Sequence, residues 1–122
     1  MLKTTESSKN SSKILIVDDD PQIITLLERM MARLKPADKI YTAKNCAEAF
    51  NLLKNHRFKL IISDYRLPDG LGLAVLQQSQ IGTYRIGISG SLGHDDFKAA
   101  CDRFIPKPFE FQELQKILNE YC

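Results

Sequence analysis

Five polar residues that could do chemistry stand at or directly after the ends of short apolar runs: Asp18, Asp19, Asp64, Ser89 and Lys107. Continuous apolar runs of this length are typical of strands buried on both faces of a parallel sheet. The carboxyl ends of parallel strands share one edge of the sheet, where open α/β sheets bind ligands. We therefore expect three carboxylates, a hydroxyl and an ammonium group to gather at one site.

The chemistry of such a site follows from its charge. Clustered carboxylates repel one another and raise each other's pKa values unless a cation offsets them. Mg²⁺ fits, because it prefers oxygen ligands and keeps water and phosphate oxygens around it. This set suits attack by the Asp64 carboxylate on a phosphoryl group, which gives an acyl phosphate. Mg²⁺ and Lys107 would offset the charge on the phosphoryl oxygens during transfer.

Each residue also has a purely structural explanation. Asp64 could be a turn aspartate, and the helix dipole could favour Asp18 and Asp19 near the start of a helix. Ser89 is an ordinary residue at the end of a strand, and Lys107, between two prolines, could be a solvated loop lysine. However, Asp20 already suits the N-cap of that helix, so capping leaves two acids unexplained. One shared site accounts for all of these residues at once.

The pattern of apolar residues predicts the strands and helices that position these five residues. Apolar runs predict five strands, over residues 13–17, 39–43, 59–64, 85–88 and 103–105. Apolar residues at three- and four-residue spacings predict helices between and after them, with a short one near Asp95–Cys101. This alternation predicts an α/β fold: a flavodoxin-like, doubly wound, five-stranded parallel sheet in the order 2-1-3-4-5, with helices on both faces.

Length and composition narrow the class of protein further. The 122 residues fit one domain over 13–122, after a polar lead-in over 1–12 that we expect to be disordered. A net charge of +2 is too balanced to favour direct binding of nucleic acid. The sequence offers neither a membrane span nor the apolar core of a secretion signal, which predicts a cytoplasmic protein.

The motifs together resemble those of a known family. The chain is similar to the receiver domain of bacterial two-component response regulators, and the resemblance spans Lys13 to about Cys122. The segments that carry it are ILIVDDDP at 14–21, DYRLPDG at 64–70, Ser89-Gly90 and KPF at 107–109.

The resemblance implies a role for each matching residue. The aspartate matching Asp64 accepts a phosphoryl group from a histidine kinase or a phosphotransfer protein. The acids matching Asp18 and Asp19 hold Mg²⁺ together with Asp64 and the main-chain carbonyl of Arg66; we expect Asp18 to act through water. The resemblance thus implies a phosphoacceptor signalling domain, with self-catalysed phosphotransfer and dephosphorylation, rather than an enzyme.

The switching residues and partners are implied in the same way. Ser89 and Lys107 match residues that contact the phosphoryl group, and the Lys107–Pro108 bond matches one that is cis. Phe104 matches an aromatic that swings with the hydroxyl of Ser89 between inactive and active states. A downstream protein or output domain would read the change, and we expect a monomer or a weak, phosphorylation-dependent dimer.

The sequence departs from the family pattern around the expected signalling face. Gly90 follows Ser89 where alanine is usual, and Cys101-Asp102 replaces a usual Gly-Ala pair. The segment between Ser89 and Lys107 is also short, so its helix is expected to be short or irregular.

Two other classes of protein remain open at this point. A binding module could keep the fold without being phosphorylated. A phosphatase of the haloacid-dehalogenase type could use Asp18 as nucleophile, but this leaves Asp64 without a role. A dinucleotide-binding domain fits less well, because the first strand is followed by acids rather than a glycine-rich loop.

Overall fold

A computed structural model describes residues 12–90 and 94–121 of the chain. Five parallel strands form the main sheet in the order β2-β1-β3-β6-β7, which confirms the predicted winding. The strands are β1 (Lys13–Val17), β2 (Lys39–Ala43), β3 (Leu60–Asp64), β6 (Tyr84–Ser89) and β7 (Arg103–Pro106). Apart from Ser12, the lead-in expected to be disordered lies outside the described residues.

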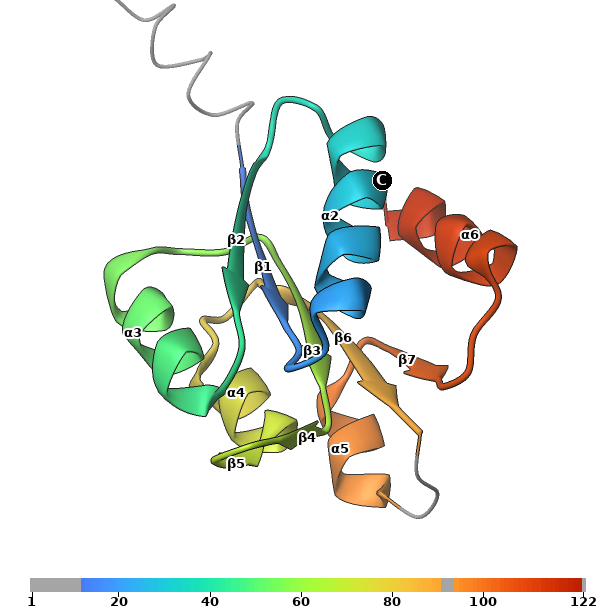
Figure 1. Ribbon diagram of the computed structural model, residues 1–122. Helices are drawn as coiled ribbons and strands as arrows, with labels where there is room; N and C mark the ends of the chain where they lie inside the picture. Colours follow the sequence, from blue (N-terminus) through green and yellow to red (C-terminus); the bar gives the residue numbers. More distant parts are fainter. Residues whose placement is uncertain (1–11, 91–93, 122) are drawn as a thin grey trace, which may run out of the picture.

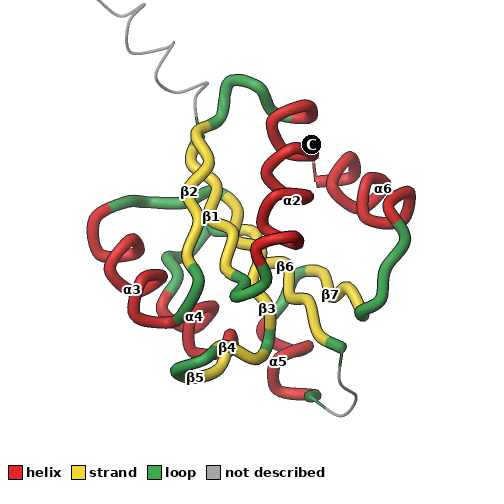
Figure 2. Tube along the Cα trace, in the orientation of Figure 1, coloured by secondary structure: helices red, strands yellow, loops and turns green. Residues whose placement is uncertain are grey.

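Helices cover both faces of this sheet, as expected (Figure 1). One face carries the first and last described helices, and the other carries the three between them; Figure 2 shows the strands as the layer in the middle. The helices are α2 (Pro21–Leu34), α3 (Cys46–Asn55), α4 (Gly72–Gln78), α5 (Asp95–Ala100) and α6 (Phe111–Tyr121). With six residues, α5 is as short as the sequence predicted.

The sheet separates two apolar cores because successive side chains of a strand point to opposite faces. Ile14 and Ile16 of β1 pack with α2 and α6, whereas Leu15 and Val17 pack with α3 and its neighbours. All five residues of β3 are buried, including Ser63 and Asp64. Packing on both faces thereby holds β3 in place, and it also fixes the position of Asp64 at the end of this strand.

Side chains at the helix starts explain where two helices begin. The carboxylate of Asp20 accepts a hydrogen bond of 2.9 Å from the Gln22 N–H, and Pro21 occupies the first helical position, as predicted. Asn45 accepts from the Glu48 N–H at 2.8 Å. The Glu48 carboxylate reaches back to the N–H of Lys44, one residue earlier than in a regular capping box.

A small hairpin follows β3 that the sequence did not predict. Its strands, β4 (Arg66–Leu67) and β5 (Gly70–Leu71), are antiparallel and too short to show an alternating pattern. It closes where the Gly72 N–H donates to the Tyr65 carbonyl. A Cβ at Gly72 would lie 1.9 Å from the carbonyl oxygen of Asp64, so only glycine fits there.

Candidate functional site

The register of the sheet brings the predicted site residues to one edge. Val17 of β1 pairs with Ser63 of β3, so the next residues, Asp18 and Asp64, end neighbouring strands. On the other side of β3, Asp64 pairs with Ile88, directly before Ser89. Ser89 in turn pairs with Pro106, and its carbonyl accepts the N–H of Lys107 at 2.8 Å. The order β1-β3-β6-β7 thus assembles the predicted cluster.

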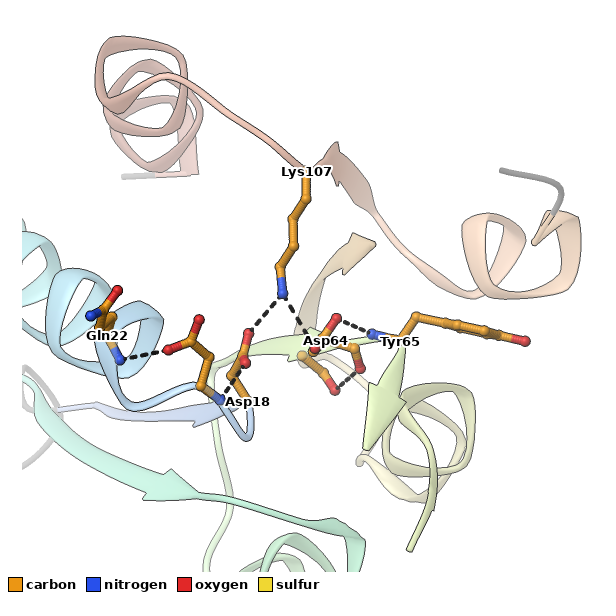
Figure 3. Close-up of polar contacts among 7 residues, drawn as sticks. Asp18, Gln22, Asp64, Tyr65 and Lys107 are labelled. Atoms are coloured by element: carbon orange, nitrogen blue, oxygen red, sulfur yellow. Dashed lines mark hydrogen bonds and ion pairs between the residues drawn. The ribbon is translucent and has the colours of Figure 1, made fainter. Parts of the chain in front are cut away.

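Lys107 bridges the two buried carboxylates. Its Nζ lies 3.4 Å from Oδ2 of Asp18 and 3.3 Å from Oδ2 of Asp64. Figure 3 shows the lysine side chain reaching over the sheet edge between these two aspartates. The peptide bond to Pro108 is cis, as the resemblance implied. The ammonium group of the lysine therefore contacts the acidic cluster, and the side chain is only partly exposed.

Asp18 is almost fully buried, with 1% of its surface exposed. Its N–H donates to the Ala43 carbonyl of β2 at 3.1 Å, and its Oδ1 accepts the N–H of Asp20 at 2.9 Å. Burial raises the pKa of Asp18, and the charge of Asp64 raises it further, although the Asp20 N–H and Lys107 act against both. The carboxylate is thus fixed in place, while its negative charge is only partly offset.

Asp64 has the same electrostatic character. Its Oδ1 accepts the N–H of Tyr65 at 2.8 Å, while its Oδ2 faces Lys107. Burial raises the pKa of Asp64 in spite of the opposing effects of Lys107 and the Tyr65 N–H. Burial would lower the pKa of Lys107, but the charges of Asp18 and Asp64 outweigh it and the net change is upward. The site holds two carboxylates against one ammonium group, so it favours a further cation.

The three aspartates could hold a metal ion together. One carboxylate oxygen each from Asp18, Asp19 and Asp64 lies within 4.8 Å of the others. Asp19 is exposed, whereas the other two are buried, so the cluster opens to solvent on the Asp19 side. A set of carboxylate oxygens with an open side fits Mg²⁺, which keeps part of its water shell.

The remaining predicted residues lie around this cluster. Arg66 begins the β4–β5 hairpin, two positions after Asp64. Ser89 is buried at the end of β6. Phe104 of β7 is half-buried and lies edge-on to Phe97, with Nζ of Lys98 5.1 Å from its ring centre. The metal-ligand role of Arg66 and the switch roles of Ser89 and Phe104 stay predictions.

Two features near the site were not predicted. The ring of Tyr65 stacks on His94 at 3.7 Å and 23°, and Figure 3 shows that it points away from Asp64. This stack joins the end of β3 to the start of α5, and no sequence pattern signals it because the residues are far apart. The second feature is Asp69, which belongs to the predicted turn but also contacts α3.

Comparison with known proteins identifies the family. The sequence pattern of the "Response regulator receiver domain" family matches residues 14–119, most of the chain. This chain belongs to that family. The response regulator protein PilR of Pseudomonas aeruginosa is 36% identical over 113 residues, which cover 87% of this chain and 25% of PilR. The chain therefore spans about a quarter of the length of that relative.

Solved receiver domains have the same architecture. A CheY-like receiver domain protein from Methanospirillum hungatei superposes with a TM-score of 0.78 at 26% identity, over 90% of this chain and 92% of the other. The response regulator TrrA of Thermotoga maritima, solved with Mg²⁺ and BeF, gives a TM-score of 0.75 at 27% identity, over 91% of this chain and 99% of TrrA. The protein is thus a signalling domain of two-component systems with a CheY-like, flavodoxin-type fold. None of the helices in residues 12–90 and 94–121 has the length and apolarity to cross a membrane.

Proposed function

We propose that Asp64 of this receiver domain accepts a phosphoryl group from a histidine kinase or a histidine phosphotransfer protein. The observation that carries this proposal is the position of Lys107 between Asp18 and Asp64 at the carboxyl edge of the sheet. Asp64 ends the central buried strand, so it is held rigidly while its Oδ2 faces the cation. The domain acts in cytoplasmic signalling and passes its state to a downstream protein or an attached output domain.

The transfer uses the carboxylate of Asp64 as nucleophile. A carboxylate oxygen of Asp64 bonds to phosphorus as the phosphorus–nitrogen bond of the phosphohistidine breaks, and the histidine leaves with that electron pair. An ionised carboxylate needs no general base. Burial raises the pKa of Asp64, and Lys107 opposes this effect by favouring the ionised form. Later attack by water on the acyl phosphate releases inorganic phosphate and restores Asp64.

Mg²⁺ is the cation that the donor set fits, and TrrA, a protein of the same fold, was solved with it. We propose that Asp19, Asp64 and the carbonyl of Arg66 hold the ion directly and that Asp18 acts through water. When bound, the ion offsets negative charge on the phosphoryl oxygens. Lys107 offers its N–H groups to the same oxygens, and its contact with Asp18 keeps it in reach.

The signal would leave the site through Ser89 and Phe104. In this proposal the Ser89 hydroxyl moves to the phosphoryl oxygens, and Phe104 turns inward to fill the space that it leaves. A phosphoryl group shifts the two-state equilibrium only because it binds better to the state in which Ser89 and Lys107 contact it. The changed surface over α5, β7 and α6 would bind a partner, either as a monomer or as a weak phosphorylation-dependent dimer.

The test is the intact mass of the protein after treatment with acetyl phosphate. The wild type is expected to gain one phosphoryl group with Mg²⁺, to lose it with time, and to gain none with a chelator. Asp64→Asn is expected to gain none. A wild type that gains nothing in Mg²⁺ supports a binding module instead. Label that persists in Asp64→Asn but disappears in Asp18→Asn supports a phosphatase-like use of Asp18.

A further inference from the structure

Asp69 at the tip of the β4–β5 hairpin is bonded to a helix that precedes it in the chain. Its Oδ1 accepts the N–H of Cys46 at 2.7 Å, and its Oδ2 accepts the N–H of Ala47 at 3.0 Å. Cys46 and Ala47 are the first two residues of α3. The carboxylate of Asp69 therefore links the hairpin that follows β3 to the start of α3.

These bonds complete the N-terminal cap of α3. The first N–H groups of a helix have no partner within it, and a carboxylate there is favoured by the helix dipole. The side chain of Asn45 accepts the N–H of Glu48, the third helical residue. Asp69 takes the first and second N–H groups, and these two bonds hold its pKa below the usual value. The helix and the hairpin thus depend on the same side chain.

The hairpin is held at both ends. At its base, the Gly72 N–H donates to the Tyr65 carbonyl, next to Asp64. At its tip, Gly70 approaches α3 so closely that a Cβ there would lie 3.1 Å from Sγ of Cys46. Between these points, the Leu67 side chain is buried in the core under α3 and α4. Arg66 precedes Leu67 and therefore lies between the contact at the base of the hairpin and the contact of its tip with α3.

The start of α3, which Asp69 contacts, is also connected to the acidic cluster. The Ala43 carbonyl at the end of β2 accepts the N–H of Asp18, and α3 begins shortly afterwards at Cys46. The segment 43–47 thus contacts Asp18 through one backbone bond and the hairpin through Asp69. Displacement of the hairpin from this segment would move the Arg66 carbonyl relative to the aspartates.

We infer that Asp69 is a positioning residue for metal binding and phosphotransfer, because its bonds to α3 set the place of the Arg66 carbonyl. The inference rests on the proposed function, which makes that carbonyl a ligand of Mg²⁺. Asp69 itself does not touch the reacting groups. It acts at a distance, as side chains outside the ligand shell of a metal commonly do.

The experiment compares Asp69→Ala with Asn45→Ala. Both variants remove a cap of α3 and are expected to lower the melting temperature, but only Asp69→Ala releases the hairpin. Titration calorimetry with Mg²⁺ is expected to show about tenfold weaker binding in Asp69→Ala and wild-type binding in Asn45→Ala. The rate of phosphorylation by acetyl phosphate, measured against Mg²⁺ concentration, is expected to shift to higher Mg²⁺ in Asp69→Ala and to recover at saturation.

Two results would overturn the inference: wild-type Mg²⁺ affinity in Asp69→Ala, or an equal loss of affinity in Asn45→Ala. If Asp69→Ala does not fold, Asp69→Asn keeps one acceptor oxygen and is expected to bind Mg²⁺ less tightly than the wild type. A wild type that binds Mg²⁺ but gains no phosphoryl group would refute the proposed function, while the calorimetric comparison would still decide the role of Asp69.

Discussion

Lys107 and Asp64 lie 3.3 Å apart, Nζ to Oδ2, although Asp64 ends β3, Lys107 directly follows β7, and β6 lies between these two strands in the sheet. The long side chain of Lys107 reaches from the end of β7 to the carboxylate of Asp64 (Figure 3). The same ammonium group also contacts Asp18. One cation therefore lies between two buried anions.

Replacing Lys107 is expected to destabilise the metal-free protein. In Lys107→Met, Asp18 and Asp64 would lose their shared cation and repel each other. The expected loss is roughly 1–3 kcal/mol in urea unfolding with a chelator, below that of a fully buried pair, because 25% of the lysine side chain is exposed. Arg103→Ala is the control, since its exposed ion pair with Glu120 is worth about 0–1 kcal/mol. Similar losses in both variants would contradict a special role for Lys107.

Asp64→Asn is expected to stabilise the metal-free protein at neutral pH. Burial raises the pKa of Asp64 above its ordinary 3.8, so the folded state disfavours the ionised form more than the unfolded state does. This penalty is absent below pH 3.8, grows as the pH rises through the raised pKa, and is complete above it. The stability gap between Asp64→Asn and wild type should therefore widen from pH 4 to pH 8 in chelator. A stability gap that does not change with pH would show that burial does not disfavour the ionised form of Asp64.

Mg²⁺ is expected to stabilise the wild type by binding the folded state alone. At 100 times the dissociation constant the gain is about 2.7 kcal/mol, measured as a rise in melting temperature. Asp19→Ala should lose most of this rise, whereas Asp95→Ala, at the exposed start of α5, should keep it. An equal rise in wild type and Asp19→Ala would mean that the ion binds elsewhere.

Much of the site could be predicted because its residues end strands. Asp18, Asp64 and Ser89 each follow an apolar run, and in a parallel sheet that alone places them on one edge. The contact of Lys107 with both acids required the strand order as well, which the alternation of strands and helices supplied. Local sequence patterns were therefore enough to predict the position of a side chain that lies at the end of a strand of the sheet.

The parts that could not be predicted depend on contacts between loops. The hairpin strands are two residues each, too short to carry an alternating pattern. Asp69 looks like an ordinary turn residue, since the Pro-Asp-Gly sequence explains it fully. Its bonds to Cys46 and Ala47 depend on how close the hairpin lies to α3, which only the assembled fold determines. The stack of Tyr65 on His94 is hidden for the same reason.

Phosphorylation is expected to turn the side chain at position 104 inward. The sequence has no tryptophan, so Phe104→Trp introduces a single fluorophore at the expected switch position. Phe104 lies against Phe97 and below Lys98, half-exposed. If phosphorylation draws Ser89 toward Asp64, the ring at 104 turns into the vacated space and loses contact with solvent. Its emission is then expected to shift to the blue when acetyl phosphate and Mg²⁺ are added together.

Three controls separate this movement from other causes. Mg²⁺ alone should leave the emission of Phe104→Trp nearly unchanged, because the ion does not bind the Ser89 hydroxyl in the proposed site. Adding Asp64→Asn should abolish the response to acetyl phosphate, since no acyl phosphate forms. Adding Ser89→Ala should leave the mass gain in place but weaken the shift, because the phosphoryl group loses the contact that couples it to β6. A full shift in the Ser89→Ala protein would show that the ring moves independently of the hydroxyl, and a phosphorylated protein with no shift would show that residue 104 does not switch.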